Sequence, residues 1–211
     1  MLSKKQIVTW LTLCHEVLEE NKTWLTQLDT AIGDADHGNN MHRGFKKVHA
    51  QLSELADKDI GAIFKAVAMT LISTVGGASG PLYGTFFLQA GNKMAGKQEL
   101  SETDVAAMMR AGLDGVKMRG KAQPGDKTMV DVLSPVTEAL EQNINDGMPV
   151  IEALAKAVEV AEQGVKDTIP LVAKKGRASY LGERSKGHQD PGATSSKLIV
   201  ECLYKAARAD S

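Results

Sequence analysis

The sequence contains little that would place the protein in a membrane or in an oxidising compartment. Its 211 residues include two cysteines, Cys14 and Cys202, and neither belongs to a CxxC motif, so we expect both to be core thiols. The longest apolar stretch, residues 66–75, is shorter than the about 20 residues that cross a bilayer. The N-terminus lacks a continuous apolar signal core. We therefore expect a cytoplasmic protein that does not span a membrane.

The sequence also lacks a charge imbalance. Its formal net charge is -1, and acidic and basic residues are mixed along the chain rather than gathered in blocks. Nucleic acids and anionic membranes are therefore not expected partners. No low-complexity tract, internal repeat or long linker divides the chain. We expect residues 1–211 to form a single domain.

The two common phosphate-binding patterns, GxxxxGK[ST] and GxGxxG, are absent, and so are alternating β-branched runs. Apolar residues recur instead at helical spacing within residues 7–18 and 41–55. Further helices are expected over residues 59–75, 81–94, 102–119, 129–142, 149–166 and 193–207. The sequence thus predicts an all-α protein whose nucleotide site, if it has one, is not a strand-to-helix phosphate loop.

Four polar, glycine-rich loops interrupt these helices, at residues 33–40, 76–81, 124–128 and 176–193. Such loops on a rigid scaffold commonly carry function. Three carboxylates, those of Asp29, Asp34 and Asp36, fall within eight positions at the start of the first loop and just before it. Hard oxygen ligands in this number suit Mg²⁺. Asp34 and Asp36 fit equally well as turn and N-cap residues. An EF-hand is excluded, because Asn39 stands where that loop needs glycine and Phe45 where it needs glutamate.

The other loops each allow two interpretations. Gly76–Gly80 offers backbone N–H groups at a helix N-terminus, which suits a phosphate, but a plain interhelical turn also explains its glycines. Thr128 fits as an N-cap or as a phosphate contact. The long loop, with its cations and glycines, is typical of either a lid over a charged ligand or a disordered surface loop. Arg177 within it suits bidentate phosphate binding.

The sequence around two histidines and three methionines predicts their roles. His37 lies among aspartates, which favour its protonated form, and either contacts a ligand or caps a helix. His188 is expected at the surface, without a catalytic role. The methionines at positions 108, 109 and 118 are expected to fill the core.

Taken together, the loops resemble a known family. The segments IGDADHGNNMHRGF (32–45), VGGASGPLYGTFFL (75–88), RGKAQPGDKTMV (119–130) and KGRASYLGERSKGHQDPGATS (175–195) are similar to the L subunit of phosphoenolpyruvate-dependent dihydroxyacetone kinases, and the match runs from end to end. The resemblance implies an antiparallel eight-helix barrel with the nucleotide site in loops at one end. It also implies ADP or ATP bridged by two Mg²⁺ ions to Asp29, Asp34 and Asp36.

The resemblance further implies the residues that contact the nucleotide. These are His37, Gly38, Asn39 and Asn40 in the first loop, Ala78 and Ser79 in the second, Gly120 and Met129 around the third, and Arg177, Asp190, Pro191 and Gly192 in the fourth. Thr128 is added because it adjoins them.

In such kinases a separate K subunit binds dihydroxyacetone, the ATP on the L subunit donates its γ-phosphoryl group, and a phosphotransferase-system carrier rephosphorylates the bound ADP. The resemblance thus implies a phosphotransferase that works with K and this carrier, as a homodimer or as a heterotetramer with K. One alternative is the nucleotide domain of an ATP-dependent dihydroxyacetone kinase, which we disfavour because Met1 leads directly into a helix. Another is a module whose ADP-bound state is sensed by a transcription regulator.

Overall fold

The computed structural model describes residues 1–209 and is built almost entirely of helices. Within these residues the elements are β1 (Leu2–Ser3), α1 (Lys4–Glu20), α2 (Lys22–Ile32), α3 (His37–Gln51), α4 (Ile60–Thr74), α5 (Ser79–Lys93), β2 (Glu99–Leu100), α6 (Glu102–Gly120), α7 (Val130–Asn145), α8 (Val150–Asp167), the 3-10 helix η1 (Arg177–Ser185) and α9 (Pro191–Ala207). The all-α prediction is confirmed. None of the helices in this range combines the length and apolar character of a bilayer-crossing segment.

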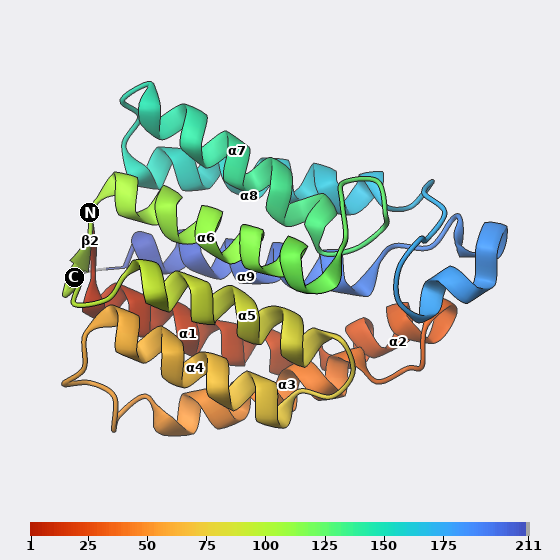
Figure 1. Ribbon diagram of the computed structural model, residues 1–211, viewed down its shortest axis with the longest axis horizontal. Helices are drawn as coiled ribbons and strands as arrows, with labels where there is room; N and C mark the ends of the chain where they lie inside the picture. Colours follow the sequence, from red (N-terminus) through yellow and green to blue (C-terminus); the bar gives the residue numbers. More distant parts are fainter. Residues whose placement is uncertain (210–211) are drawn as a thin grey trace.

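Eight of these helices form a closed ring. Each of α3 to α9 packs against the next, α9 packs against α1, and α1 packs against α3. Successive helices of the ring run in opposite directions (Figure 1). This is the predicted antiparallel eight-helix barrel. The alternating directions bring the α2–α3, α4–α5, α6–α7 and α8–α9 connections to one end, on the right of Figure 1.

Helix α2 was not predicted and does not belong to the ring. It lies at the loop end against α3, and it buries only Leu25, Asp29 and Ile32 along its length. Its apolar residues Leu25, Leu28 and Ile32 stand at helical spacing, so the sequence did carry a signal for this helix. One of its buried residues is an aspartate, which points to a role at the site rather than in the core.

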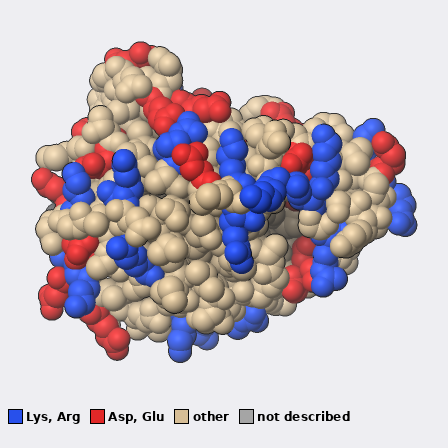
Figure 2. Space-filling model, in the orientation of Figure 1, with Lys and Arg blue, Asp and Glu red and all other residues tan. Residues whose placement is uncertain are grey.

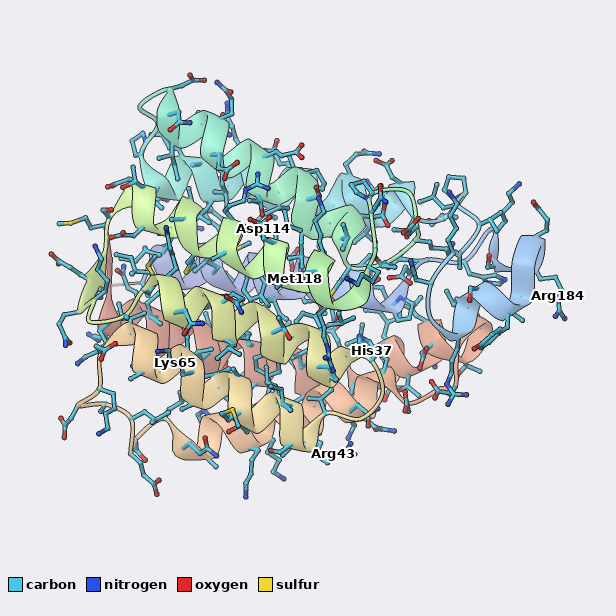
Figure 3. The ribbon with its side chains drawn as sticks, viewed as in Figure 1. His37, Arg43, Lys65, Asp114, Met118 and Arg184 are labelled. Carbon is cyan, nitrogen blue, oxygen red and sulfur yellow. The ribbon has the colours of Figure 1, made fainter. Side chains whose placement is uncertain are left out.

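The core fills the ring with aromatic and aliphatic side chains. Trp10, Phe64 and Phe87 pack against one another with ring centroids 5.7 to 5.9 Å apart, and the Trp10 indole donates to the carbonyl of Ile199, 3.0 Å away. Cys14 and Cys202 are buried free thiols, as expected. Met108 and Met109 are also buried, but Met118 is 64% exposed, so its assignment to the core was wrong. It lies on the outer side of α6 (Figure 3).

The end of the barrel opposite the loops is closed by caps and a short sheet. Ser3, Asp59 and Ser101 each accept a backbone N–H at the start of α1, α4 and α6. The strands β1 and β2 pair antiparallel, with Leu2 opposite Leu100. Two-residue strands leave no recognisable alternation in the sequence, which is why none was predicted. Of the four helices that begin at this end within residues 1–209, only α8, which follows Pro149, lacks a side-chain cap.

Candidate nucleotide site

A cavity of about 460 Å³ opens at the loop end of the barrel. All four connections contribute to it, and the first residues of α3, α5, α7 and α9 line it. In Figure 2 the molecule is hollowed at this end, with Lys and Arg side chains along one edge and Asp or Glu side chains along another. A helix N-terminus attracts anions, because its first N–H groups lack partners within the helix and its dipole is positive there. Four such ends around one cavity favour an anionic ligand.

The three predicted aspartates meet at the wall of this cavity. One carboxylate oxygen from each of Asp29, Asp34 and Asp36 lies within 4.8 Å of the other two. The last turn of α2 supplies Asp29, which is buried, and its Oδ2 accepts from the backbone N–H groups of Asp36 (2.9 Å) and His37 (3.1 Å). These bonds fix one carboxylate against the start of α3. Asp36 is the N-cap residue of α3, but its side chain makes no cap hydrogen bond.

Gly33 makes room for this arrangement. A Cβ atom at position 33 would lie 2.0 Å from Oδ1 of Asp29, which is far inside van der Waals contact. Glycine is required here by the close approach of the carboxylate. Gly33 and Asp34 therefore both serve the carboxylate cluster, the first by leaving room for Asp29 and the second as one of the three carboxylates.

The carboxylate cluster fits a hard divalent cation. Mg²⁺ prefers oxygen ligands and is commonly held by one or two protein carboxylates together with phosphate oxygens. Three carboxylates this close repel one another unless a cation lies among them. One cation is already present, because Nε of Arg177 lies 2.8 Å from Oδ2 of Asp34. Arg177 belongs to η1, so this ion pair joins the first loop to the fourth.

The second loop leads into α5 and leaves the start of that helix without a side-chain cap. Its N-cap residue is Ala78, which has no side-chain oxygen to offer. Gly80 is required by packing, because a Cβ atom there would lie 2.2 Å from the carbonyl oxygen of Val75. Ala78 and Ser79 both line the cavity. The phosphate-binding interpretation of this loop is therefore compatible with the structure.

His37 is the first residue of α3 and does not cap it. Its ring is buried between two hydroxyl groups, with Nε2 2.9 Å from Oγ of Ser195 and Nδ1 3.2 Å from Oγ of Ser79. Tyr83 extends this network, since its hydroxyl lies 2.6 Å from Oγ of Ser195. Burial lowers the pKa of His37 and outweighs the opposing effect of Asp29, Asp36 and Asp34. The aspartates thus favour the protonated form of His37, as expected, but burial has the larger effect on its pKa.

The third connection supplies both polar and apolar groups. The hydroxyl oxygen of Thr128 accepts a hydrogen bond from the backbone N–H of Val130 (3.1 Å), and the backbone N–H of Thr128 donates to Oδ2 of Asp131 (2.8 Å). Thr128 thus stabilises the start of α7 and also lines the cavity. Gly120 and Met129, two of the residues expected to contact a nucleotide, also line the cavity. An apolar part of the wall was not predicted and consists of Leu82, Val116, Ala122 and Val130. Their helical spacing gives the same signal as core residues, so the sequence alone does not distinguish them.

The fourth connection contains a 3-10 helix rather than an unstructured loop. Arg177 lines the cavity, whereas Arg184 lies at the outer tip and points away from it (Figure 3). Asp190 is buried, caps α9 by accepting the N–H of Ala193 (2.8 Å), and has its pKa raised by burial to about 7. Pro191 and Gly192 complete this side of the cavity. His188 is exposed, as expected.

Two predicted contact residues lie away from the cavity, and three cations were missed. Gly38 packs α3 against α2, since a Cβ atom there would lie 1.9 Å from the carbonyl oxygen of Lys22. Asn39 is exposed, whereas its neighbour Asn40 is buried and lines the cavity. The missed cations are Lys127, Arg119 and Lys175, all of which line the cavity. Arg119 and Lys175 each stand directly before a glycine in the sequence, which was the available signal for these two.

Comparisons with known proteins agree with this geometry. Residues 31–205 match the family model described as the DAK2 domain. The chain is 53% identical to the ADP-binding subunit of the PEP-dependent dihydroxyacetone kinase of Escherichia coli (strain K12), an alignment that covers 98% of this chain and 99% of that protein. It is 42% identical to the ADP-binding subunit of the PTS-dependent dihydroxyacetone kinase of Lactococcus lactis, with 97% and 98% covered.

Solved structures show the same fold within a longer chain. The native dihydroxyacetone kinase of C. freundii superimposes with a TM-score of 0.75 at 26% identity, covering 97% of this chain and 35% of that one. The complex of that kinase with AMP-PNP and Mg²⁺ gives a TM-score of 0.73 at 25% identity. The present chain thus spans about a third of the solved chain's length.

Proposed function

This chain belongs to the DAK2-domain family of dihydroxyacetone kinase ADP-binding subunits, and from this membership we propose that it holds ADP or ATP in the cavity and donates the γ-phosphoryl group of ATP. The observation that carries the proposal is the carboxylate cluster in a cavity bounded by four helix N-termini. A site with this charge distribution suits a nucleotide whose phosphates are paired with divalent cations. The AMP-PNP and Mg²⁺ complex of the C. freundii kinase supports the same assignment.

In this proposal Asp29, Asp34 and Asp36 hold two Mg²⁺ ions, which neutralise phosphate charge when bound. The start of α5 and the guanidinium of Arg177 bind phosphate oxygens. The apolar wall accommodates the adenine ring, as aromatic ligands commonly lie against such surfaces. The proposed nucleotide contacts are the predicted residues that line the cavity, namely His37, Asn40, Ala78, Ser79, Gly120, Thr128, Met129, Arg177, Asp190, Pro191 and Gly192.

The proposed reaction divides its work between subunits. The bond from the γ-phosphorus to the β–γ bridging oxygen breaks, and a new bond forms to a hydroxyl oxygen of dihydroxyacetone held by the K subunit. ADP stays on this chain, where a phosphotransferase-system phosphoryl carrier restores ATP. Such transfer asks of the chain mainly positioning and charge neutralisation. This requirement matches a site made of fixed carboxylates, helix N-termini and Arg177, rather than of a nucleophile and a base.

A staged assay with γ-labelled ATP tests the proposal. The isolated chain, preloaded with labelled ATP and Mg²⁺, is expected to retain the nucleotide without phosphorylating dihydroxyacetone. Adding the K subunit is expected to release about one labelled product per bound ATP, and sustained turnover is expected only with the carrier and phosphoenolpyruvate. Native mass spectrometry of the same sample reports the bound ADP, the Mg²⁺ and the homodimer or the heterotetramer with K. Repeated turnover by this chain with free ATP alone would contradict the proposed division of labour.

A further inference from the structure

Lys127 lies in the third connection and is an unusual lysine. Its side chain is 1% exposed, and its Nζ donates to three main-chain carbonyl oxygens, those of Thr168 (2.6 Å), Ile169 (3.4 Å) and His188. An ammonium group has three protons. All of them are therefore used within the protein, and none remains for a phosphate oxygen. Although Lys127 borders the cavity, its geometry is not that of a ligand-binding lysine.

The backbone at Lys127 is also strained. Its φ angle is +63°, in the left-handed region that costs a residue with a side chain roughly 1 kcal/mol or more. Burial disfavours the charged ammonium and lowers its pKa, while Asp190 and Asp131 act in the opposite direction. Strain and burial of a charge persist only where surrounding contacts compensate for them. The three carbonyls are the compensation that the structure shows.

These carbonyls lie at the two ends of one segment. Thr168 and Ile169 follow α8, and His188 precedes α9, so Lys127 joins both ends of the segment 169–188 to the third connection. The N–H of Gly187 also donates to the carbonyl of Ile169 (2.8 Å), which closes the base of the segment. Arg177, in the middle of the segment, reaches Asp34. Lys127 thus holds the base of the loop whose centre meets the carboxylate cluster.

We propose that Lys127 is a positioning residue that fixes the base of segment 169–188 and thereby places Arg177 over the carboxylate cluster and the phosphates. The proposal rests on the proposed nucleotide function, because Arg177 acts on a ligand only if the cavity binds one. A second bond supports the same arrangement, since the N–H of Lys174 donates to the carbonyl of Asp126, 3.1 Å away and beside Lys127. Lys127 acts through the loop without touching the nucleotide.

The first test needs no nucleotide. Lys127→Met removes the ammonium but keeps an unbranched stem, and Lys174→Met is the matched control, because it removes an exposed lysine from the segment itself. Limited trypsin digestion of both variants and the wild type is followed by mass spectrometry. Lys127→Met is expected to be cut at least about tenfold faster at Arg177 and Arg184, with unchanged rates outside the segment. Equal rates at these two sites in all three proteins would overturn the proposal.

The second test asks whether Lys127 acts through Arg177, by means of a double-mutant cycle. The dissociation rate of a fluorescent ADP analogue, with Mg²⁺ present, is measured for Lys127→Met, Arg177→Ala and the double variant. If Lys127 acts by placing Arg177, Lys127→Met accelerates dissociation about tenfold when Arg177 is present. In the Arg177→Ala background it accelerates dissociation less than twofold. Full additivity of the two effects would refute the positioning role, since a merely structural loss acts independently of Arg177.

The outcomes separate this inference from the proposed function. If the wild type binds no ADP with Mg²⁺, the proposed function fails, whereas the digestion test still decides whether Lys127 holds the segment. If Lys127→Met does not fold, Lys127→Arg keeps the charge and serves in both tests. Its guanidinium cannot reproduce the three-carbonyl geometry of an ammonium, so partial acceleration of both digestion and dissociation is expected. Wild-type values for a folded Lys127→Arg would then overturn the proposal.

Discussion

Replacing Gly33 with alanine should disable the carboxylate cluster while leaving the barrel intact. The added Cβ would lie 2.0 Å from Oδ1 and 2.9 Å from Cγ of Asp29, whereas distances below 3.0 Å are essentially never found. The carboxylate must therefore move by at least 3.0 - 2.0 = 1.0 Å. The φ angle of Gly33, -141°, lies outside the left-handed region that favours glycine, so the contact with Asp29 is the feature that this change tests.

The size of the effect follows from the bonds that Asp29 would lose. Its Oδ2 accepts two backbone N–H groups, from Asp36 and His37, and a hydrogen bond to a charged group contributes about 1.5–3 kcal/mol. Losing one of them, together with the alignment of one cation ligand, predicts an affinity for ADP with Mg²⁺ that is roughly 10- to 100-fold weaker, at about 1.4 kcal/mol per factor of ten.

Isothermal titration of Gly33→Ala with ADP at saturating Mg²⁺ measures this change, and circular dichroism reports whether the helices persist. Asp29→Asn is the matched comparison, because it keeps an oxygen acceptor in place but removes the charge. We expect both variants to be helical and both to bind weakly. Wild-type affinity in Gly33→Ala would show that the position of the Asp29 carboxylate does not matter, which would refute the steric argument.

Three further predictions address the other parts of the site. Asp34→Asn and Asp36→Asn should each remove most of the stabilisation by ADP, because a ligand at 100 times its Kd adds about 2.7 kcal/mol and a 100-fold weaker one about 0.4 kcal/mol; thermal unfolding with and without ADP measures this. Arg177→Ala should weaken retention of ADP about tenfold without changing the melting temperature of the ligand-free protein, because its side chain is 69% exposed; stopped-flow displacement checks the first part and calorimetry the second. Burial raises the pKa of Asp190 from 3.8 to about 7, so between these values the folded state binds more protons than the unfolded chain, and stability falls as the pH rises towards 7. Asp190→Asn cannot titrate at this position, so its free energy of unfolding should rise by about 2–3 kcal/mol relative to that of the wild type between pH 5 and pH 8. Urea unfolding in the presence of EDTA measures this difference. A difference that does not change with pH would argue against a buried carboxyl that titrates near neutrality.

The sequence was sufficient for the ring helices because each has a wide apolar face and clear stop signals. Helix α2 was missed although Leu25, Leu28 and Ile32 stand at helical spacing, because only Asn21 separates it from α1 and no glycine or proline marks the break. Met118 was misassigned because its residue type, like that of Met108 and Met109, is common in cores. The buried residues near it on α6 are Gly112, Leu113, Gly115 and Val116, and Met118 lies off the face that they form.

At the site, the predicted aspartates lie together because they are close in sequence, whereas Lys127 could be identified only from the structure. Its acceptors are main-chain carbonyls at positions 168, 169 and 188, and main-chain groups leave no mark on the identity of the residue that bears them. The same limit explains His37. Its charged neighbours were visible in the sequence, but the burial that lowers its pKa depends on α5 and α9, which supply Ser79 and Ser195.

The helix starts at the loop end of the barrel are satisfied in different ways, and this difference indicates where an anion can bind. The first N–H groups of α3 and α7 donate to the side chains of Asp29 and Thr128, and α9 is capped by Asp190. The start of α5 has no side-chain cap, because its N-cap residue is Ala78. A missing cap costs a helix about 1 kcal/mol, and an anionic ligand can offset this cost by accepting the N–H groups at that start. The carboxylate cluster lies beside these helix starts, where carboxylates and phosphates would repel each other without divalent cations between them. The arrangement therefore couples the two ligands, since the phosphates need the helix ends and the cations need both the phosphates and the aspartates.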